Sequence, residues 1–303
     1  MQNHNFHTHS LYSDGKYTLR EVADAALDKG FTHLGFSDHS YARVEEDYCM
    51  THEGEISYRE KVRSLADEYE DRIKIYLGIE QDSESEIPDY EYDYIISSVH
   101  EMARHGESLP IDSSAELLKK LVDDLFCGSS DDFAKAYFDK VTDNVARNKT
   151  DIIGHFDLPT KFSTIPETDS YVKYAIDAVH ECMKYCDLFE LNTGAIARGL
   201  TVLPYPAGFI LDEIGKAGGR IIVTSDCHYK EKLTVWFDKA DEYLMSYGFT
   251  ANDNGSINEK ISGIRIWESK KYFRIFDQRH IIAIHLQFYD NKGGFYGKLS
   301  YTA

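Results

Sequence analysis

The sequence predicts an α/β protein in which about seven strand–helix units form a closed or nearly closed (β/α) barrel. Two observations lead to this class. Short apolar segments rich in β-branched residues alternate with amphipathic helical segments along the first 265 residues. Each strand is followed by a single crossover segment, and such crossovers give parallel pairing. A doubly wound open sheet is the alternative architecture that the same alternation allows.

The individual elements can be placed from apolar periodicity and from helix boundary signals. Strands are predicted at residues 3–9, 32–37, 73–80, 93–99, 151–155, 188–192 and 220–225. Helices are predicted at residues 18–29, 57–70, 114–126, 131–147, 170–186, 207–217 and 236–247. In the first helix, Thr18 offers an N-cap, Glu21 completes a capping box, and Gly30 ends the helix. We expect residues 1–268 to form the barrel domain and residues 269–303, rich in aromatic and β-branched side chains, to form an extension packed on it.

Charge and composition limit the classes of partner. The chain has 33 basic and 52 acidic side chains, a formal charge of -19. This balance argues against a nucleic-acid partner, because affinity for nucleic acids rests largely on basic side chains. A small anionic substrate is compatible with it if the site supplies local positive charge. The sequence has no run of 18 apolar residues and no secretory pattern, and its five cysteines lack a Cys-x-x-Cys pair. These features predict no membrane partner and a reducing, cytoplasmic location.

Every predicted strand ends in side chains that can bind a metal ion. In chain order they are His7 and His9, Asp38 and His39, Glu80, His100, His155 and Asp157, Glu190 and Asn192, and Asp226 and His228. In a (β/α) barrel these ends converge on one face. Six of the 13 histidines lie there, and such a cluster would repel or stay unpaired without a cation. The sequence therefore predicts a multinuclear site, and imidazole with carboxylate suits zinc, manganese or iron.

These motifs, in this order, resemble those of the polymerase and histidinol phosphatase (PHP) superfamily. They are His7-Thr8-His9, Ser13-Asp14-Gly15, Ser37-Asp38-His39, Gly78-Ile79-Glu80, Ser98-Val99-His100, Gly154-His155-Phe156-Asp157, Glu190-Leu191-Asn192-Thr193 and Ser225-Asp226-Cys227-His228. The resemblance covers about residues 3–230. Within the superfamily, the motifs around Glu80, His100 and Glu190 most resemble those of the histidinol-phosphate phosphatases.

The resemblance implies a distorted, TIM-like (β/α)7 barrel with two or three divalent metal ions at the C-terminal ends of its strands. It implies a first ion held by His7, His9, Glu80 and Asp226. Glu80 would bridge to a second ion on His100 and His155. A third ion would be held by His39 and His228 with help from Asp14. Asp14 could instead orient the turn at residues 12–16.

The other polar strand-end residues are assigned supporting roles. Asp38 and Asp157 are expected to orient imidazoles rather than to bind metal. Glu190 and Asn192 are expected either to do the same or to touch the substrate.

Such a centre would hydrolyse a phosphate monoester. A water between two divalent ions loses its proton near neutral pH and attacks phosphorus in line with the leaving alcohol. Arg198 and Lys161 are the cations expected to bind the phosphate, although a solvated surface charge is the alternative for each. Asp226 or a metal-bound water would protonate the leaving alkoxide, and Glu80 would hold the two ions together.

The resemblance implies a metal-dependent phosphatase that converts L-histidinol phosphate to L-histidinol and phosphate in histidine biosynthesis. One alternative is a related phosphatase for a nucleotide bisphosphate, a sugar phosphate or phosphotyrosine. Others are a nuclease or proofreading module and a non-catalytic metal-binding domain. Amidohydrolases also begin with a His-x-His strand, but they favour a bridging lysine and eight strands, whereas here Glu80 supplies the bridge.

Overall fold

The computed structural model describes residues 2–42, 48–269, 286–289 and 295–299. The chain divides into two compact units, Met1–Lys270 and Lys271–Ala303. In the second unit, β12 (Leu286–Tyr289) pairs antiparallel with β13 (Phe295–Leu299). The predicted packing of residues 269–303 on the barrel involves segments outside the described residues. In the described part of the chain, no helix is both long and apolar enough to span a bilayer.

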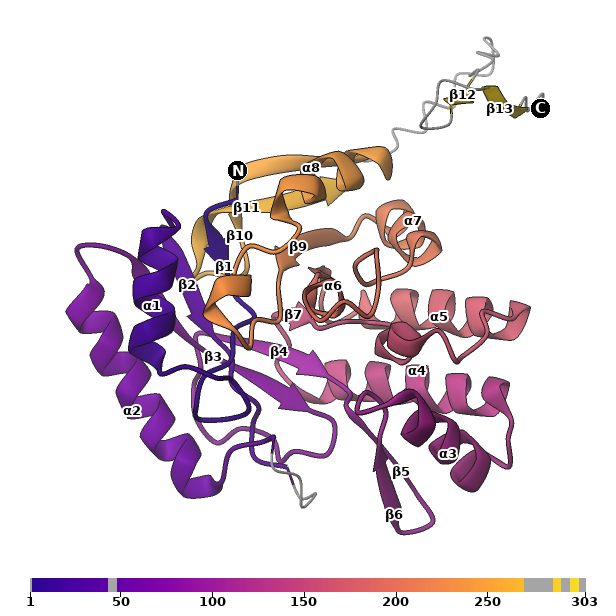
Figure 1. The fold of residues 1–303 in the computed structure, drawn as a ribbon, viewed down its shortest axis with the longest axis horizontal. Helices are drawn as coiled ribbons and strands as arrows, with labels where there is room; N and C mark the ends of the chain where they lie inside the picture. Colours follow the sequence, from indigo (N-terminus) through magenta and orange to yellow (C-terminus); the bar gives the residue numbers. More distant parts are fainter. Residues whose placement is uncertain (1, 43–47, 270–285, 290–294, 300–303) are drawn as a thin grey trace. The chain divides into compact units, whose positions relative to one another are not determined.

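The first unit is built on a curled sheet whose seven parallel strands follow the chain order (Figure 1). These strands are β1 (His4–Asn5), β2 (His33–Phe36), β3 (Lys74–Asp82), β4 (Tyr94–Ser98), β7 (Ile152–Ile153), β8 (Leu188–Asn192) and β9 (Arg220–Thr224). Beyond β1, Thr8 forms a parallel bridge with Cys227, and the His9 amide donates to the Cys227 carbonyl at 2.9 Å. The first and last strands therefore meet at their C-terminal ends, and the predicted distorted barrel is confirmed.

Two antiparallel strands interrupt the barrel between the first and last parallel strands, at the N-terminal end of β9. The strands β10 (Phe249–Ser256) and β11 (Ser262–Ser269) form a hairpin, and β11 pairs with the start of β9. At that end β9 is bonded to β11 instead of β1. This hairpin is not predicted from the sequence, because the polar β10 segment has no alternating apolar pattern.

A second unpredicted hairpin follows β4 directly. The strands β5 (Glu101–Arg104) and β6 (Glu107–Pro110) are joined by His105 and Gly106, whose φ angles are 56° and 85°. Two consecutive residues with positive φ make the tight turn that suits a two-residue hairpin loop. The hairpin separates His100 from the segment that leads into the next helix.

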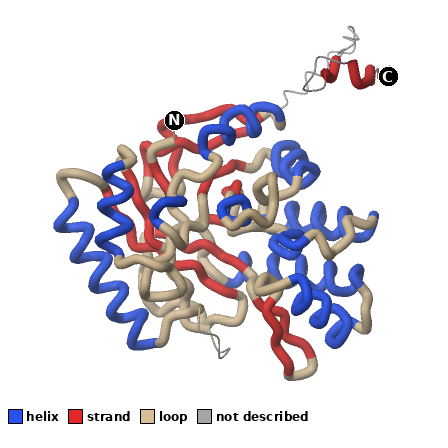
Figure 2. The backbone as a smooth tube through the Cα atoms, in the orientation of Figure 1, coloured by secondary structure: helices blue, strands red, loops and turns tan. Residues whose placement is uncertain are grey.

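Helices cover the outside of the sheet (Figure 2). They are α1 (Leu19–Asp28), α2 (His52–Tyr69), α3 (Ala115–Phe126), α4 (Ser130–Arg147), α5 (Asp169–Cys182), α6 (Gly194–Ala197), α7 (Gly208–Ala217) and α8 (Phe237–Ser246). Short 3-10 turns, η1 (Leu158–Phe162) and η2 (Lys230–Lys232), lie between them. The capping box of Thr18 and Glu21 is confirmed. Helix α2 begins earlier than predicted because the Thr51 side chain accepts a hydrogen bond from the Gly54 amide.

The barrel interior contains aromatic side chains on the N-terminal side of the strand ends. The Tyr94 hydroxyl donates to the carbonyl oxygens of Phe6 and Phe36 at 2.7 and 3.1 Å. Its ring meets Phe6 edge-on at a centroid distance of 5.4 Å, and the His4 ring lies 5.6 Å from that of Phe6. These contacts join β1, β2 and β4.

His4 gives the fold a specific sensitivity to acid. Its side chain is fully buried, and neither ring nitrogen has a hydrogen-bond partner among the described residues. Burial, with repulsion from His33 and Arg265, lowers the pKa of His4 from 6.5 to about 3. Between these values the unfolded chain binds a proton that the folded chain does not. The free energy of unfolding should therefore fall by about 1.4 kcal/mol per pH unit on acidification from pH 6.5.

We expect His4→Leu to remove this dependence. Denaturant unfolding at pH 6.5, 5.5 and 4.5 should show a shallower decline for the variant than for the natural chain. His52→Leu, at the exposed start of α2, is the control and should leave the slope unchanged. Parallel pH profiles for His4→Leu and the natural chain would contradict the assignment.

Candidate metal centre

All nine predicted ligands converge at the C-terminal ends of the parallel strands. They are His7, His9, Asp14, His39, Glu80, His100, His155, Asp226 and His228. Asp14 lies in the turn after β1, Glu80 lies inside β3, and the others directly follow strands. The side chain of Asp14 is 31% exposed, whereas the other carboxylates and imidazoles of the cluster are buried or nearly so.

Glu80 lies at the middle of the cluster. Its Oε2 is 3.1 Å from His7 Nε2 and 3.0 Å from His39 Nδ1. Its Oε1 is 3.1 Å from His155 Nε2 and 3.5 Å from His100 Nε2. One carboxylate thus faces imidazoles from four strand ends, which is the position of a bridging ligand.

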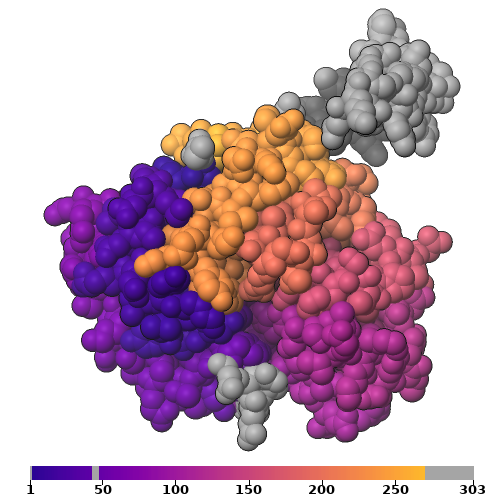
Figure 3. Space-filling view, viewed as in Figure 1, coloured from indigo at the N-terminus to yellow at the C-terminus, as the bar shows by residue number. Residues whose placement is uncertain are grey.

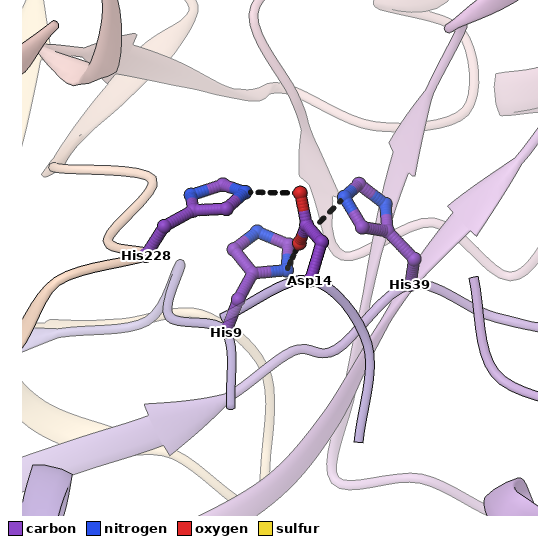
Figure 4. Close-up of side chains that lie close together, drawn as sticks. All are labelled: His9, Asp14, His39 and His228. Carbon is purple, nitrogen blue, oxygen red and sulfur yellow. Dashed lines mark ion pairs between the residues drawn. The ribbon is translucent and has the colours of Figure 1, made fainter. Parts of the chain in front are cut away.

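Two further groups flank Glu80. In the first, His9 Nε2 is 3.2 Å from Asp226 Oδ1, and His7 Nε2 is 3.8 Å from the same oxygen. In the second, the carboxylate of Asp14 lies among three imidazoles, 2.9 Å from His228 Nε2, 3.7 Å from His39 Nε2 and 3.8 Å from His9 Nδ1 (Figure 4). His9 belongs to both groups, so its loss would affect both.

The donor atoms fit divalent metal ions. In the described chain, Nε2 of His7 and His9 and Nδ1 of His39 lie 3.0 to 3.2 Å from carboxylate oxygens but form no well-aligned hydrogen bond. Glu80 Oε2 and Asp14 Oδ1 form none either. Buried polar atoms are rarely left unpaired, because the loss of hydration is costly. A cation between these atoms would satisfy them together. Nitrogen and carboxylate donors without thiolate suit zinc, manganese or iron.

Glu80 and His39 have the ionisation that metal ligands need, although in the metal-free cluster neighbouring carboxylates, against the effect of burial, raise the pKa of His7, His100 and His228. Burial alone would raise the pKa of Glu80, but the imidazoles of His7 and His39 hold that pKa well below its ordinary value. Burial lowers the pKa of His39 to about 3, even though Glu80 lies beside it. The carboxylate is therefore charged and the imidazole neutral at pH 7, and these are the forms that bind metal ions.

Two glycines leave the space that the positions of Asp14 and Asp226 require. A Cβ on Gly15 would lie 2.5 Å from backbone atoms of His9 and Ser10, so only glycine lets this turn fold back on β1. A Cβ on Gly194 would lie 2.9 Å from the Asp226 side chain. Asp226 itself has a φ of 46°. This left-handed conformation turns the chain between Asp226 and His228.

Two carboxylates outside the cluster orient its imidazoles. Glu190 Oε1 lies 2.5 Å from His7 Nδ1, and Glu190 Oε2 accepts from the His155 amide at 2.8 Å. Asp82 Oδ2 accepts from the His100 amide at 2.9 Å and lies 3.0 Å from His100 Nδ1. Glu190 was among the predicted residues, but Asp82 was missed. Its signal is its position two residues after Glu80 in one strand, which places both on the same face.

Two sequence predictions are corrected by the observed contacts. Asp38 was expected to orient an imidazole, but it accepts hydrogen bonds from the Ser10 amide and the Ser13 hydroxyl, both at 2.7 Å. Asp157 was expected to do the same, but its Oδ2 accepts from the Ala207 amide at 3.0 Å.

Asn192 was expected either to help orient an imidazole or to touch the substrate. Its side chain is buried, donating to Glu190 at 2.9 Å and accepting from the Gly194 amide at 2.8 Å. Asp38 and Asp157 therefore hold loops near the cluster, whereas Asn192 supports Glu190, which contacts the His7 ring.

Because Glu190 fixes the His7 ring, we expect Glu190→Gln to weaken metal binding about 10- to 100-fold. The neutral amide is a poorer acceptor for an imidazole N–H and makes His7 a weaker ligand. Competition with a fluorescent chelator measures the affinity. Glu181→Gln, which removes an exposed carboxylate paired with Lys184 on α5, should change nothing. Equal affinities for the natural chain and Glu190→Gln would contradict this role.

A cavity of about 620 Å³ opens above the cluster. Its wall includes Asp14, His39, His100, His155, Asp226 and His228, together with Lys16, Tyr48, Asp112, Ser113, Lys161 and Arg198. Arg198 Nη2 lies 3.1 Å from His228 Nδ1 and 3.8 Å from Asp226 Oδ1. Lys161 Nζ donates to the carboxylate and the carbonyl oxygen of Asp112. The structure thus places both predicted cations in the wall of this cavity.

A distorted seven-stranded barrel with imidazoles and carboxylates clustered at the C-terminal strand ends is the architecture of a metal-dependent hydrolase. A protein-family model for the PHP domain matches residues 5–194. The chain belongs to the PHP domain family.

Two curated relatives differ in what they share with the chain. The "Probable histidinol-phosphatase" of Deinococcus radiodurans is 26% identical over 241 residues, which are 76% of this chain and 88% of that protein. The DNA polymerase/3'-5' exonuclease PolX of Bacillus subtilis is 31% identical over 105 residues, but these are only 31% of this chain and 17% of that protein.

Among solved structures, the fold is similar to that of a histidinol phosphate phosphatase from Lactococcus lactis. That protein was crystallised with zinc, L-histidinol and phosphate. The TM-score is 0.62 at 20% sequence identity, and the match covers 87% of this chain and 98% of that one. At this identity, the likeness establishes a shared fold.

Proposed function

We propose that the chain is a metal-dependent phosphomonoesterase that hydrolyses L-histidinol phosphate to L-histidinol and phosphate, a step of histidine biosynthesis. The observation that carries this proposal is the convergence of nine candidate ligands in one cluster, six of which line the same cavity as two cations. The name of the Deinococcus relative, which matches over most of both chains, supports the substrate.

In this proposal each ligand keeps the role expected from the sequence, and the ions number two or three. His7, His9, Glu80 and Asp226 would hold the first ion, and Glu80, His100 and His155 the second. Asp14, His39 and His228 surround the place of a third. When bound, such ions lower the pKa of coordinated water and neutralise charge on the phosphoryl oxygens.

The remaining residues bind and orient the ester. Arg198 presents a guanidinium, which can grip two phosphoryl oxygens at once. Lys161 adds a second positive charge from η1. Although burial opposes it, the charges of His7 and Arg198 hold the pKa of Asp226 well below its ordinary value. Asp226 is therefore better suited to bind a metal ion than to donate a proton, and solvent in the cavity would protonate the leaving alkoxide.

The site favours a small ester over a polynucleotide. The chain carries a formal charge of -19, and a nucleic-acid strand needs a basic track along its phosphates. The similarity to PolX is confined to 105 residues and keeps a nuclease as the second candidate. The proposal therefore includes a small-molecule substrate, no nucleic-acid or membrane partner, and action in the cytoplasm.

The decisive assay measures phosphate release from L-histidinol phosphate beside sugar phosphates, nucleotide 3′,5′-bisphosphates and phosphotyrosine. The protein is purified without chelator, and its metal content is counted. A labelled single-stranded oligonucleotide is included to test for nuclease activity. We expect selective turnover of L-histidinol phosphate with two or three ions per chain. Preference for another ester would overturn the substrate, and cleavage of the oligonucleotide would favour the nuclease. A chain that binds no metal would overturn the mechanism.

A further inference from the structure

Among the described residues that line the cavity, one carboxylate lies outside the metal cluster. Asp112 follows β6 and lies in the cavity wall beside Ser113. Its Oδ2 accepts from Lys161 Nζ at 2.8 Å, and its main-chain oxygen accepts from the same nitrogen at 2.9 Å. The Lys161 side chain is 5% exposed, whereas that of Asp112 is 26% exposed. The carboxylate is therefore the more accessible member of this ion pair.

Asp112 opposes the binding of a phosphate ester that carries no positive charge of its own. The wall around the cluster already contains Asp14 and Asp226, and a further negative charge repels phosphoryl oxygens. Asp112 also occupies two of the three N–H groups of Lys161, because an ammonium has three donors. A simple phosphate ester would thus meet a lysine whose charge is largely neutralised by its neighbour.

A substrate with its own positive charge changes this balance. If an ammonium group of the substrate binds beside the Asp112 carboxylate, the negative charge of Asp112 is shared between that ammonium and Lys161. Lys161 then acts on the phosphate with less of its charge cancelled. In an ester of a 2-amino alcohol, the ammonium lies three atoms from the bridging oxygen, so one small molecule can reach both members of the pair.

We propose that Asp112 is a specificity-determining residue that binds the ammonium group of a 2-amino alcohol phosphate and couples its recognition to phosphate binding by Lys161. This inference rests on the proposed function and extends that function from one substrate to a chemical class of substrates. Esters without an ammonium are disfavoured because they leave Asp112 to repel the phosphate, so that specificity comes from repulsion between like charges.

Binding is tested first, because it does not require turnover. The probes are 3-aminopropylphosphonate and propylphosphonate, a non-hydrolysable pair with the same spacing, titrated calorimetrically into metal-loaded protein. We expect the natural chain to bind the amino compound at least about tenfold more tightly. In Asp112→Asn this preference should fall to within about threefold. Inorganic phosphate should bind several-fold more tightly to the variant, since a repelling charge is gone and Lys161 is released.

Turnover is tested with L-histidinol phosphate and its analogue that lacks the amino group. The ratio of their kcat/KM values should collapse in Asp112→Asn, mainly through a higher KM for the amino ester. Asp124→Asn removes an equal charge from the exposed face of α3 and should keep the ratio. Lys161→Met should weaken phosphate binding but keep the preference for the amino compound, which provides a second test if Asp112→Asn fails to fold.

The outcomes separate the two proposals. An equal loss for both members of each pair would show that Asp112 only supports Lys161 and would overturn the inference. A clear ammonium preference in binding, lost in Asp112→Asn, combined with no hydrolysis of L-histidinol phosphate by metal-loaded protein, would overturn the proposed function and leave this inference standing.

Discussion

Replacing His9 by alanine should reduce kcat for phosphate release by about 10³-fold or more, even with metal ions supplied. His9 lies between two groups of candidate ligands, 3.2 Å from Asp226 through Nε2 and 3.8 Å from Asp14 through Nδ1. Its ring also lies 4.2 Å from that of His228 and 4.4 Å from that of His39. Alanine would remove one ligand and loosen two others, and the loss of a directly acting group commonly has effects of this size.

The measurement combines phosphate release with metal content from elemental analysis. At least one ion per chain should be lost in parallel with activity. His180→Ala is the matched control, because His180 is exposed on α5 and pairs only with Glu213 among the described residues. Full turnover by His9→Ala would eliminate a metal-dependent mechanism at this cluster.

Replacing Arg198 by alanine should lower kcat/KM for phosphate esters by about 10²-fold, mostly through a higher KM. The guanidinium ends in the cavity between His228 and Asp226, where a phosphate held by the cluster would meet it. Arg198→Lys should recover only part of the loss, because an ammonium cannot make the bidentate contact. Inhibition by inorganic phosphate should weaken in the same order.

Steady-state kinetics at constant metal occupancy provide the measurement. Arg20→Ala is the comparison, since Arg20 is an exposed arginine that pairs with Glu68 away from the cavity. If Arg198→Ala changed the thermal midpoint but left KM and phosphate inhibition intact, Arg198 would be a structural residue and the assignment would be wrong.

The fold could be predicted from the sequence where local signals and packing agree. The strands that precede Asp38 and Asp226 are apolar runs bounded by polar residues, so their positions followed directly from the pattern. The cap at Thr18 is equally local. The β10–β11 hairpin could not be found in this way, because its stability comes from pairing with β9 rather than from its own composition.

The candidate site shows the same division. Strand-end residues could be grouped because the barrel brings the ends of parallel strands together. Asp112 lies after a hairpin that the sequence did not reveal, so nothing placed it beside Lys161. The partners of Asp38 and Asp157 depend on how the loops fold. A carboxylate next to a histidine in sequence is a poor guide to which imidazole, if any, it contacts.

The bridge between Thr8 and Cys227 closes the barrel at the same place where the candidate metal ligands meet. His7 and His9 flank one side of this bridge, and Asp226 and His228 flank the other. An ion bound by both His9 and Asp226 would therefore cross-link the first and last segments of the barrel, which are more than two hundred residues apart in sequence. In Figure 3 the indigo N-terminal part of the chain and the orange part that follows the last barrel strand lie side by side. The concentration of free metal ions would then decide how strongly these two parts are held together, so the protein's resistance to heat should rise and fall with its metal supply.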